Sequence, residues 1–320
     1  MHEELFILRP NDSKWTFDPQ DLPKTFILHD HHGGYDKNFK NNFLYEKLNN
    51  QQHTIITHQI YDKRVHENYP NLCIKFSAEL QSQMNFCWFT NYTIHPTRDY
   101  NNFVCSFNGA NHVGRQLLVS ALNKFGYFKN DYCSKNFTNT GDEVDGHVQA
   151  YVKNTEFYNK FFDLTDKFSQ HIYSFGNVSY EYLDNIRTFE KQLAQSFLHI
   201  VSETMADSYH PFVTEKFLYS VITKGLFLAY AQPDWHAHLE KYYGFRLYTN
   251  LFDYRFDSIT NPVERLVELM TMIGKFSKLT TDEWHDLYLL EQENVEFNYN
   301  HYFSKNYLKS LKQFDNTDNI

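Results

Sequence analysis

Short apolar segments alternate with segments of helical length along most of this chain, and that alternation constrains the fold more than any other feature. In the first third, the apolar segments are residues 5–8, 25–29, 54–57, 72–76 and 86–89. They return at residues 103–107, 197–201 and 226–230. Buried strands separated by helices are typical of parallel sheets with helices on their faces. We therefore predict an α/β protein built on parallel sheets.

The polar, proline-containing segment at residues 94–102 divides the two series of apolar segments. With 320 residues, 42% of them hydrophobic, the chain is long enough for two cores of ordinary domain size. We expect one domain over residues 1–97, a second over residues 98–290, and a helical tail over residues 291–320.

Residues 212–233 combine a charged helix start with a buried strand. Thr214 is a favourable N-cap residue, Glu215 and Lys216 fall in the first turn, and an apolar stripe follows before Gly225 ends the helix. Residues 226–230 then predict a short buried strand.

A helix start of this kind favours binding of a phosphate group. Its first backbone N–H groups are unpaired and carry a partial positive charge, to which Lys216 adds a full charge. Glu215 is unusual beside a site for an anion alone, but it suits a ligand that also carries sugar hydroxyls or develops positive charge. The alternative is a capped surface helix with a solvated Glu–Lys pair.

Three segments together resemble a known family. They are the VTEK motif at residues 213–216 with its helix and strand, the strand, polar loop and Arg-bearing helix at residues 103–128, and the run HLEKYYGFRLYTNLFDYRFD at residues 238–257. Their order and content resemble the donor domain of α-1,3-fucosyltransferases and of related glycosyltransferases of tailed phages. The resemblance covers roughly the last two thirds of the chain. It implies the GT-B architecture, in which two Rossmann-like domains with parallel sheets face one another.

The resemblance also implies a donor site for a nucleoside-diphosphate sugar in the second domain. Lys216 and Arg115 would hold the diphosphate, because charge builds there as the leaving group departs. Glu215 would accept hydrogen bonds from donor hydroxyls or stabilise an oxocarbenium-like transition state. The implied donor-binding set is Asn108, Gly109, Arg115, Thr214, Lys216 and Tyr219. From the residues alone, Arg115 could equally be a surface arginine, and Tyr219 a core aromatic.

The acceptor hydroxyl needs a general base, which we expect from the first domain. Asp30 is our candidate and His31 the second choice, because both follow the apolar segment 25–29, and ligands bind at the carboxyl ends of strands in open α/β sheets. The alternative is a polar loop before the Gly33–Gly34 turn. The resemblance provides no acceptor-side carboxylate for this chain.

No metal or bound cofactor is expected, with the nucleotide sugar acting as a co-substrate. The chain has no Asp-x-Asp triplet, and the histidines around His31 and around His236 lack carboxylates at ligand spacing. Its four cysteines form no CxxC pair, which predicts a reduced, cytoplasmic protein. No apolar run approaches the roughly 20 residues that a membrane span needs.

The expected activity is that of a metal-independent hexosyl- or pentosyltransferase. A net charge of −9 argues against general adhesion to nucleic acid. The phage resemblance, with a composition rich in Asn, Lys, Phe and Tyr, nevertheless favours a hydroxymethylated pyrimidine in phage DNA as acceptor. One alternative is a fucosyltransferase-like enzyme acting on a cell-surface glycan. Another is a non-catalytic protein that binds a nucleotide sugar or a glycan.

Overall fold

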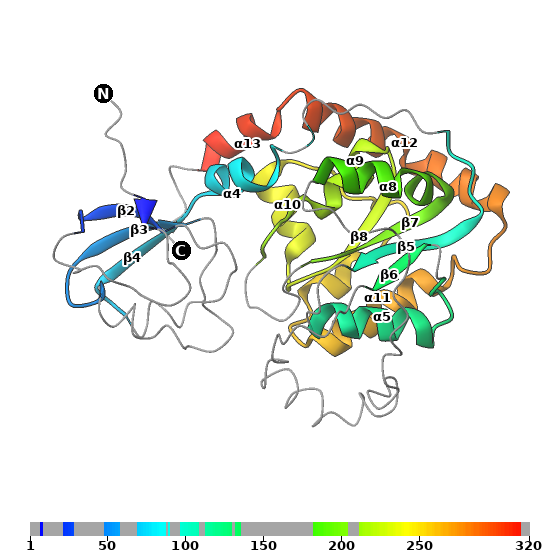
Figure 1. Ribbon diagram of the computed structural model, residues 1–320, viewed down its shortest axis with the longest axis horizontal. Helices are drawn as coiled ribbons and strands as arrows, with labels where there is room; N and C mark the ends of the chain where they lie inside the picture. The colour runs from blue at the N-terminus through cyan, green and yellow to red at the C-terminus, as the bar shows by residue number, and fades with distance from the viewer. Residues whose placement is uncertain are drawn as a thin grey trace.

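The computed structural model of the chain describes residues 7–8, 22–28, 48–57, 69–87, 89, 97–108, 113–129, 132–135, 182–203 and 211–314. These residues form two four-stranded sheets, with strand orders β1-β2-β3-β4 and β6-β5-β7-β8. All of their strand pairings are parallel. Figure 1 shows the smaller sheet at one end and the second sheet between two layers of helices. The predicted α/β fold with parallel sheets is confirmed.

The first sheet follows the predicted apolar segments closely. Its strands are β1 (Ile7–Leu8), β2 (Thr25–Leu28), β3 (His53–Thr57) and β4 (Leu72–Phe76). Phe26, Ile55 and Leu72 supply buried side chains from three adjacent strands. Apolar side chains therefore hold these strands together, as expected for a parallel sheet.

The predicted strand at residues 86–89 is wrong. Helix α4 (Ala78–Asn85) begins at Ser77, whose hydroxyl accepts a hydrogen bond from the Leu80 N–H at 3.2 Å. Phe86 and Phe89 follow its end and are both fully buried. The Phe86 ring packs against Tyr243, with ring centroids 4.9 Å apart. These two phenylalanines are therefore buried against the C-terminal half of the chain and do not extend the first sheet.

The second sheet consists of β5 (Asn102–Asn108), β6 (Cys133–Lys135), β7 (Ser196–Ser202) and β8 (Leu226–Tyr230). Helices α5 (Val113–Lys124) and α11 (Pro262–Gly274) cover one face (Figure 1). Helices α8 (Tyr182–Gln195), α9 (Leu218–Ile222) and α12 (Thr281–Phe303) cover the other. Every residue of β7 and β8 is buried, which fits strands covered on both faces.

The C-terminal elements include one irregular stretch and one long capped helix. Residues 244–248, between α10 (Trp235–Tyr243) and the 3₁₀ turn η3 (Tyr254–Ser258), have no regular secondary structure. Thr280 caps α12 through a capping box with Glu283. The predicted boundary between residues 290 and 291 falls inside α12. No helix in the described ranges has the length and apolarity to cross a membrane.

Helix α4 joins the first sheet to the helices of the C-terminal half, and it packs beside α13 (Tyr307–Phe314) (Figure 1). The Asn85 side-chain amide donates a 2.6 Å hydrogen bond to the Val213 carbonyl. The Tyr302 hydroxyl donates to the Phe86 carbonyl at 2.9 Å and accepts from the Phe89 N–H at 3.2 Å. These buried contacts bridge more than a hundred residues of sequence.

Two glycines with left-handed backbone allow a matched test of packing around the end of α10. Gly244 has φ +70°, and a Cβ placed there would lie 2.8 Å from Ser310 Oγ and 3.2 Å from His301 Nε2. Gly126 has φ +77° and nothing within 4 Å of such a Cβ. We expect Gly126→Ala to cost about 1–2 kcal/mol from backbone strain alone. Gly244→Ala should cost more in urea unfolding, and Ser310→Ala should recover part of the difference. Equal costs for both alanines would contradict this packing.

Candidate functional site

The order of strands in the second sheet reverses between β5 and β7. From β5 the chain moves to β6 on one side, then crosses back to β7 on the other side and continues to β8. In open parallel sheets, ligands bind outside the carboxyl ends of the two strands that flank such a reversal. We therefore expect a functional site among the residues that follow β5 and β7.

Arg115 lies in the first turn of α5, the helix that follows β5. It is only 4% exposed, and its Nε has no hydrogen-bond partner in the part of the chain that the structure describes. Burial lowers the pKa of Arg115, and the carboxylates of Glu203 and Glu215 partly offset this effect. An arginine this buried is uncommon unless opposite charges lie nearby, and here the carboxylates of Glu203 and Glu215 provide them.

Glu203 follows the last residue of β7 and is 1% exposed. Its carboxylate accepts two hydrogen bonds from Thr214, one from the backbone N–H at 3.0 Å and one from the hydroxyl at 2.5 Å. The Thr214 hydroxyl in turn accepts a 2.9 Å hydrogen bond from Lys216 Nζ. Thr214 thus connects the carboxyl end of β7 to the ammonium group of Lys216.

Glu215 completes a group of charges that we call the charged cluster, consisting of Arg115, Glu203, Glu215 and Lys216. Glu215 Oε1 lies 3.2 Å from Lys216 Nζ, and their side chains are 9% and 20% exposed. Burial raises the pKa of the Glu203 carboxyl, while the charge of Lys216 and the bonds from Thr214 lower it. The cluster brings two cations and two carboxylates from α5, β7 and η2 to one edge of the sheet.

Glu203 is the member of this cluster that the sequence predictions missed. The available signal was its position, because a carboxylate directly after a largely apolar strand lies at the edge where α/β proteins bind ligands. Its buried contacts with Thr214, eleven residues further along, could not be read from local spacing.

The predicted helix start at Thr214 is shorter than expected. Thr214 does act as an N-cap, but of a 3₁₀ turn, η2 (Glu215–Phe217), which leads into the five-residue helix α9. So short a helix aligns few peptide dipoles, so its N-terminus contributes little to anion binding. The longer helix α5, with Arg115 in its first turn, is the stronger source of such a dipole here.

The other predicted site residues lie in several places. Asn108 ends β5 at the same sheet edge and is fully buried, with its amide donating to Ser106 Oγ at 3.2 Å. Tyr219 is buried between aromatic rings, 5.5 Å from the ring centroid of Phe89 and 6.4 Å from that of Phe189. Asp30, His31 and Gly109 lie outside the described residues.

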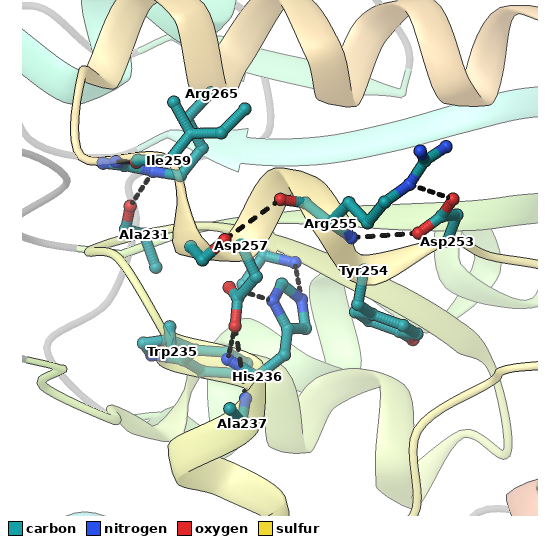
Figure 2. A network of polar contacts seen from close by, with 12 residues as sticks. Ala231, Trp235, His236, Ala237, Asp253, Tyr254, Arg255, Asp257, Ile259 and Arg265 are labelled. Carbon is teal, nitrogen blue, oxygen red and sulfur yellow. Dashed lines mark hydrogen bonds and ion pairs between the residues drawn. The ribbon is translucent and has the colours of Figure 1, made fainter.

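A second buried polar network surrounds Asp257 (Figure 2). His236 Nδ1 lies 2.6 Å from Asp257 Oδ1, and His236 Nε2 accepts a 3.0 Å hydrogen bond from the Ala229 N–H. Asp257 Oδ2 accepts from the backbone N–H groups of His236 and Ala237 and so caps α10. Both ring nitrogens of His236 are engaged, so this network holds α10 against β8. No group of three or more potential metal-ligating side chains occurs among the described residues.

Comparisons of the chain with protein-family models, with curated proteins and with solved structures found no match. The geometry of the charged cluster is therefore the basis for the functional argument that follows.

Beneath this edge of the sheet, His199 on β7 gives a test of the pH dependence of folding. Its Nδ1 lies 2.6 Å from Ser220 Oγ, and burial lowers its pKa from 6.5 to about 3. Between these values only the unfolded chain binds the proton, so stability should fall with falling pH, by up to about 1.4 kcal/mol per pH unit. His199→Gln should flatten this slope in urea unfolding. An unchanged slope in His199→Gln would contradict the assignment.

Proposed function

We propose that this protein is a glycosyltransferase that uses a nucleoside-diphosphate sugar as donor, with the charged cluster as its diphosphate site. The observation that carries the proposal is the convergence of Arg115 and Lys216 at the strand-order reversal between β5 and β7. Arg115 is buried with an unpartnered Nε, which fits a cation held ready for an anionic ligand. The resemblance of the VTEK and Arg-bearing segments to donor motifs adds independent support.

The cations would act on the charge that develops as the sugar leaves. Without ligand, Lys216 Nζ is shared between Glu215 Oε1 at 3.2 Å and Thr214 Oγ1 at 2.9 Å. A phosphate oxygen would compete with these acceptors, because hydrogen bonds from ammonium or guanidinium groups to phosphate are strong. Lys216 and Arg115 would then stabilise the diphosphate more in the transition state than in the ground state, which is the condition for catalysis.

Glu215 would gain a role as Lys216 turns toward the phosphates. A carboxylate beside the diphosphate can accept hydrogen bonds from sugar hydroxyls and can stabilise positive charge on the anomeric carbon. In the proposed GT-B arrangement the first sheet supplies the acceptor side, and Asp30 or His31 after β2 supplies the base. Our proposed acceptor is a hydroxymethylated pyrimidine in DNA, which would have to be extruded from the duplex to react.

Calorimetric titration with a panel of nucleoside diphosphates tests the donor site. We expect one of them to bind, and we expect Arg115→Met and Lys216→Met each to weaken its binding about 10- to 100-fold. A hydrogen bond to a charged group contributes about 1.5–3 kcal/mol. Methionine keeps much of the volume of both stems while removing the charge. Lys224→Met is the matched control, because Lys224 lies just beyond α9 and pairs with Glu296 at 2.8 Å.

Circular dichroism and urea unfolding of each variant separate loss of binding from loss of folding. Unchanged affinity in both folded site variants, or no binding of any nucleotide by the natural protein, would overturn the donor site.

Mass spectrometry of acceptors tests the transfer reaction. With the bound nucleotide supplied as its sugar conjugates, we expect a hexose or pentose to be added to DNA that contains hydroxymethylated pyrimidines. A product on glycan acceptors alone would identify the fucosyltransferase-like alternative. Binding of the nucleotide sugar with neither transfer nor hydrolysis would identify a binding protein instead.

A further inference from the structure

The hydrogen bonds around Thr214 have a fixed direction. Its hydroxyl has one proton, and an ionised Glu203 can only accept, so the Thr214 hydroxyl donates to Glu203 Oε2. Lys216 Nζ can only donate, so it donates to Thr214 Oγ1. While the Glu203 carboxylate is ionised, the hydroxyl proton of Thr214 is therefore used in the hydrogen bond to Glu203.

A diphosphate would upset the charge balance of the cluster. Its two cations already face two carboxylates, and a diphosphate adds at least two negative charges to this buried edge. Glu215 keeps direct contact with an ammonium group at 3.2 Å and some solvent exposure. Glu203 is 1% exposed, and burial already raises the pKa of its carboxyl. Glu203 is therefore the carboxylate whose ionised form a second anion disfavours most.

We propose that Glu203 is a positioning residue that takes up one proton when a diphosphate group binds, and that this proton redirects the Thr214 hydroxyl from Glu203 to the bound anion. The inference rests on the proposed function and names the regulation of the same site. It makes binding of the diphosphate depend on pH.

The proton transfer is balanced without any change in carbon bonds. A solvent proton bonds to Glu203 Oε2, and the resulting acid donates a hydrogen bond to Thr214 Oγ1. The Thr214 hydroxyl keeps its own proton and turns to donate it in a hydrogen bond to a phosphate oxygen. The charged groups facing Glu203 among the described residues are Arg115 from α5 and Glu215 and Lys216 from η2. Of these, Glu215 opposes a second negative charge, and the two cations attract the diphosphate.

The test is calorimetric titration of inorganic pyrophosphate into the full chain and into E203Q, from about pH 6 to pH 8.5. At each pH the titration is repeated in buffers of different ionisation enthalpy, which reports the protons taken up. A glutamine amide mimics the protonated acid. The natural protein should take up about one more proton than E203Q at the upper end of this range. As the pH rises, the affinity of the natural protein for pyrophosphate should also fall relative to that of E203Q, by up to about tenfold per pH unit.

Comparison between the two proteins cancels the ionisation of pyrophosphate itself, because the ligand is the same. E296Q is the matched control, since it removes a partly exposed carboxylate from its pair with Lys224, and its affinity and proton uptake should match those of the natural protein. Equal proton uptake by E203Q and the natural protein, or weaker binding by E203Q at every pH, would overturn the role of Glu203. No binding of pyrophosphate by the natural protein would overturn the proposed function and, with it, this inference.

A second variant decides the matter if E203Q does not fold. T214V keeps the shape of the side chain but removes the hydroxyl that the proton is proposed to redirect. We expect T214V to lose about tenfold in pyrophosphate affinity near pH 6, because valine cannot donate to the anion. The loss should be smaller near pH 8.5, because there the natural protein must first give up the hydrogen bond from Thr214 to the ionised Glu203. An equal loss at both pH values would show that Thr214 is only structural and would overturn the proposal.

Discussion

The reversal of strand order between β5 and β7 is the constraint on which the rest of the second sheet depends. Strands β6 and β7 lie on opposite sides of β5, and the next described helices after β5 and β7, α5 and α9, lie on opposite faces of the sheet (Figure 1). Arg115 therefore arrives from the α5 side, and Glu203 from the end of β7. The parallel pairing of all four strands brings their carboxyl ends to one edge, so charges distant in sequence meet there.

In the charged cluster, opposite charges offset the free-energy cost of burying ionised side chains. A buried guanidinium without a counter-charge would be very unfavourable, and Glu203 and Glu215 provide that compensation. The same carboxylates would compete with an anionic ligand for both cations. The cluster is therefore compensated without a ligand, and the proposed diphosphate would bind by exchanging one set of partners for another. This exchange, more than simple attraction, is what the proposed donor site requires of Lys216 and Thr214.

Much of the fold could be predicted from the sequence because local patterns determine it. Strands β4 and β8 match the predicted apolar runs at residues 72–76 and 226–230, where short apolar segments are bounded by polar ones. Phe86 and Phe89 were misread because an aromatic pair can be buried equally well in a strand or in a turn under distant helices. The position of Thr214 as a cap followed from local chemistry, whereas its partner Glu203 depends on how β7 approaches η2, which no local pattern encodes.

The hydrogen bond from Asn85 ends on Val213, the residue directly before Thr214. Helix α4 directly follows β4 of the first sheet, so that sheet is tied to the backbone of the turn that presents the hydroxyl and ammonium groups of the cluster. A ligand that draws this turn outward must stretch or break the Asn85 contact. If the cluster binds the proposed diphosphate in this way, binding there and the orientation of the first sheet would be coupled through one amide group, and the coupling free energy would be the same in both directions.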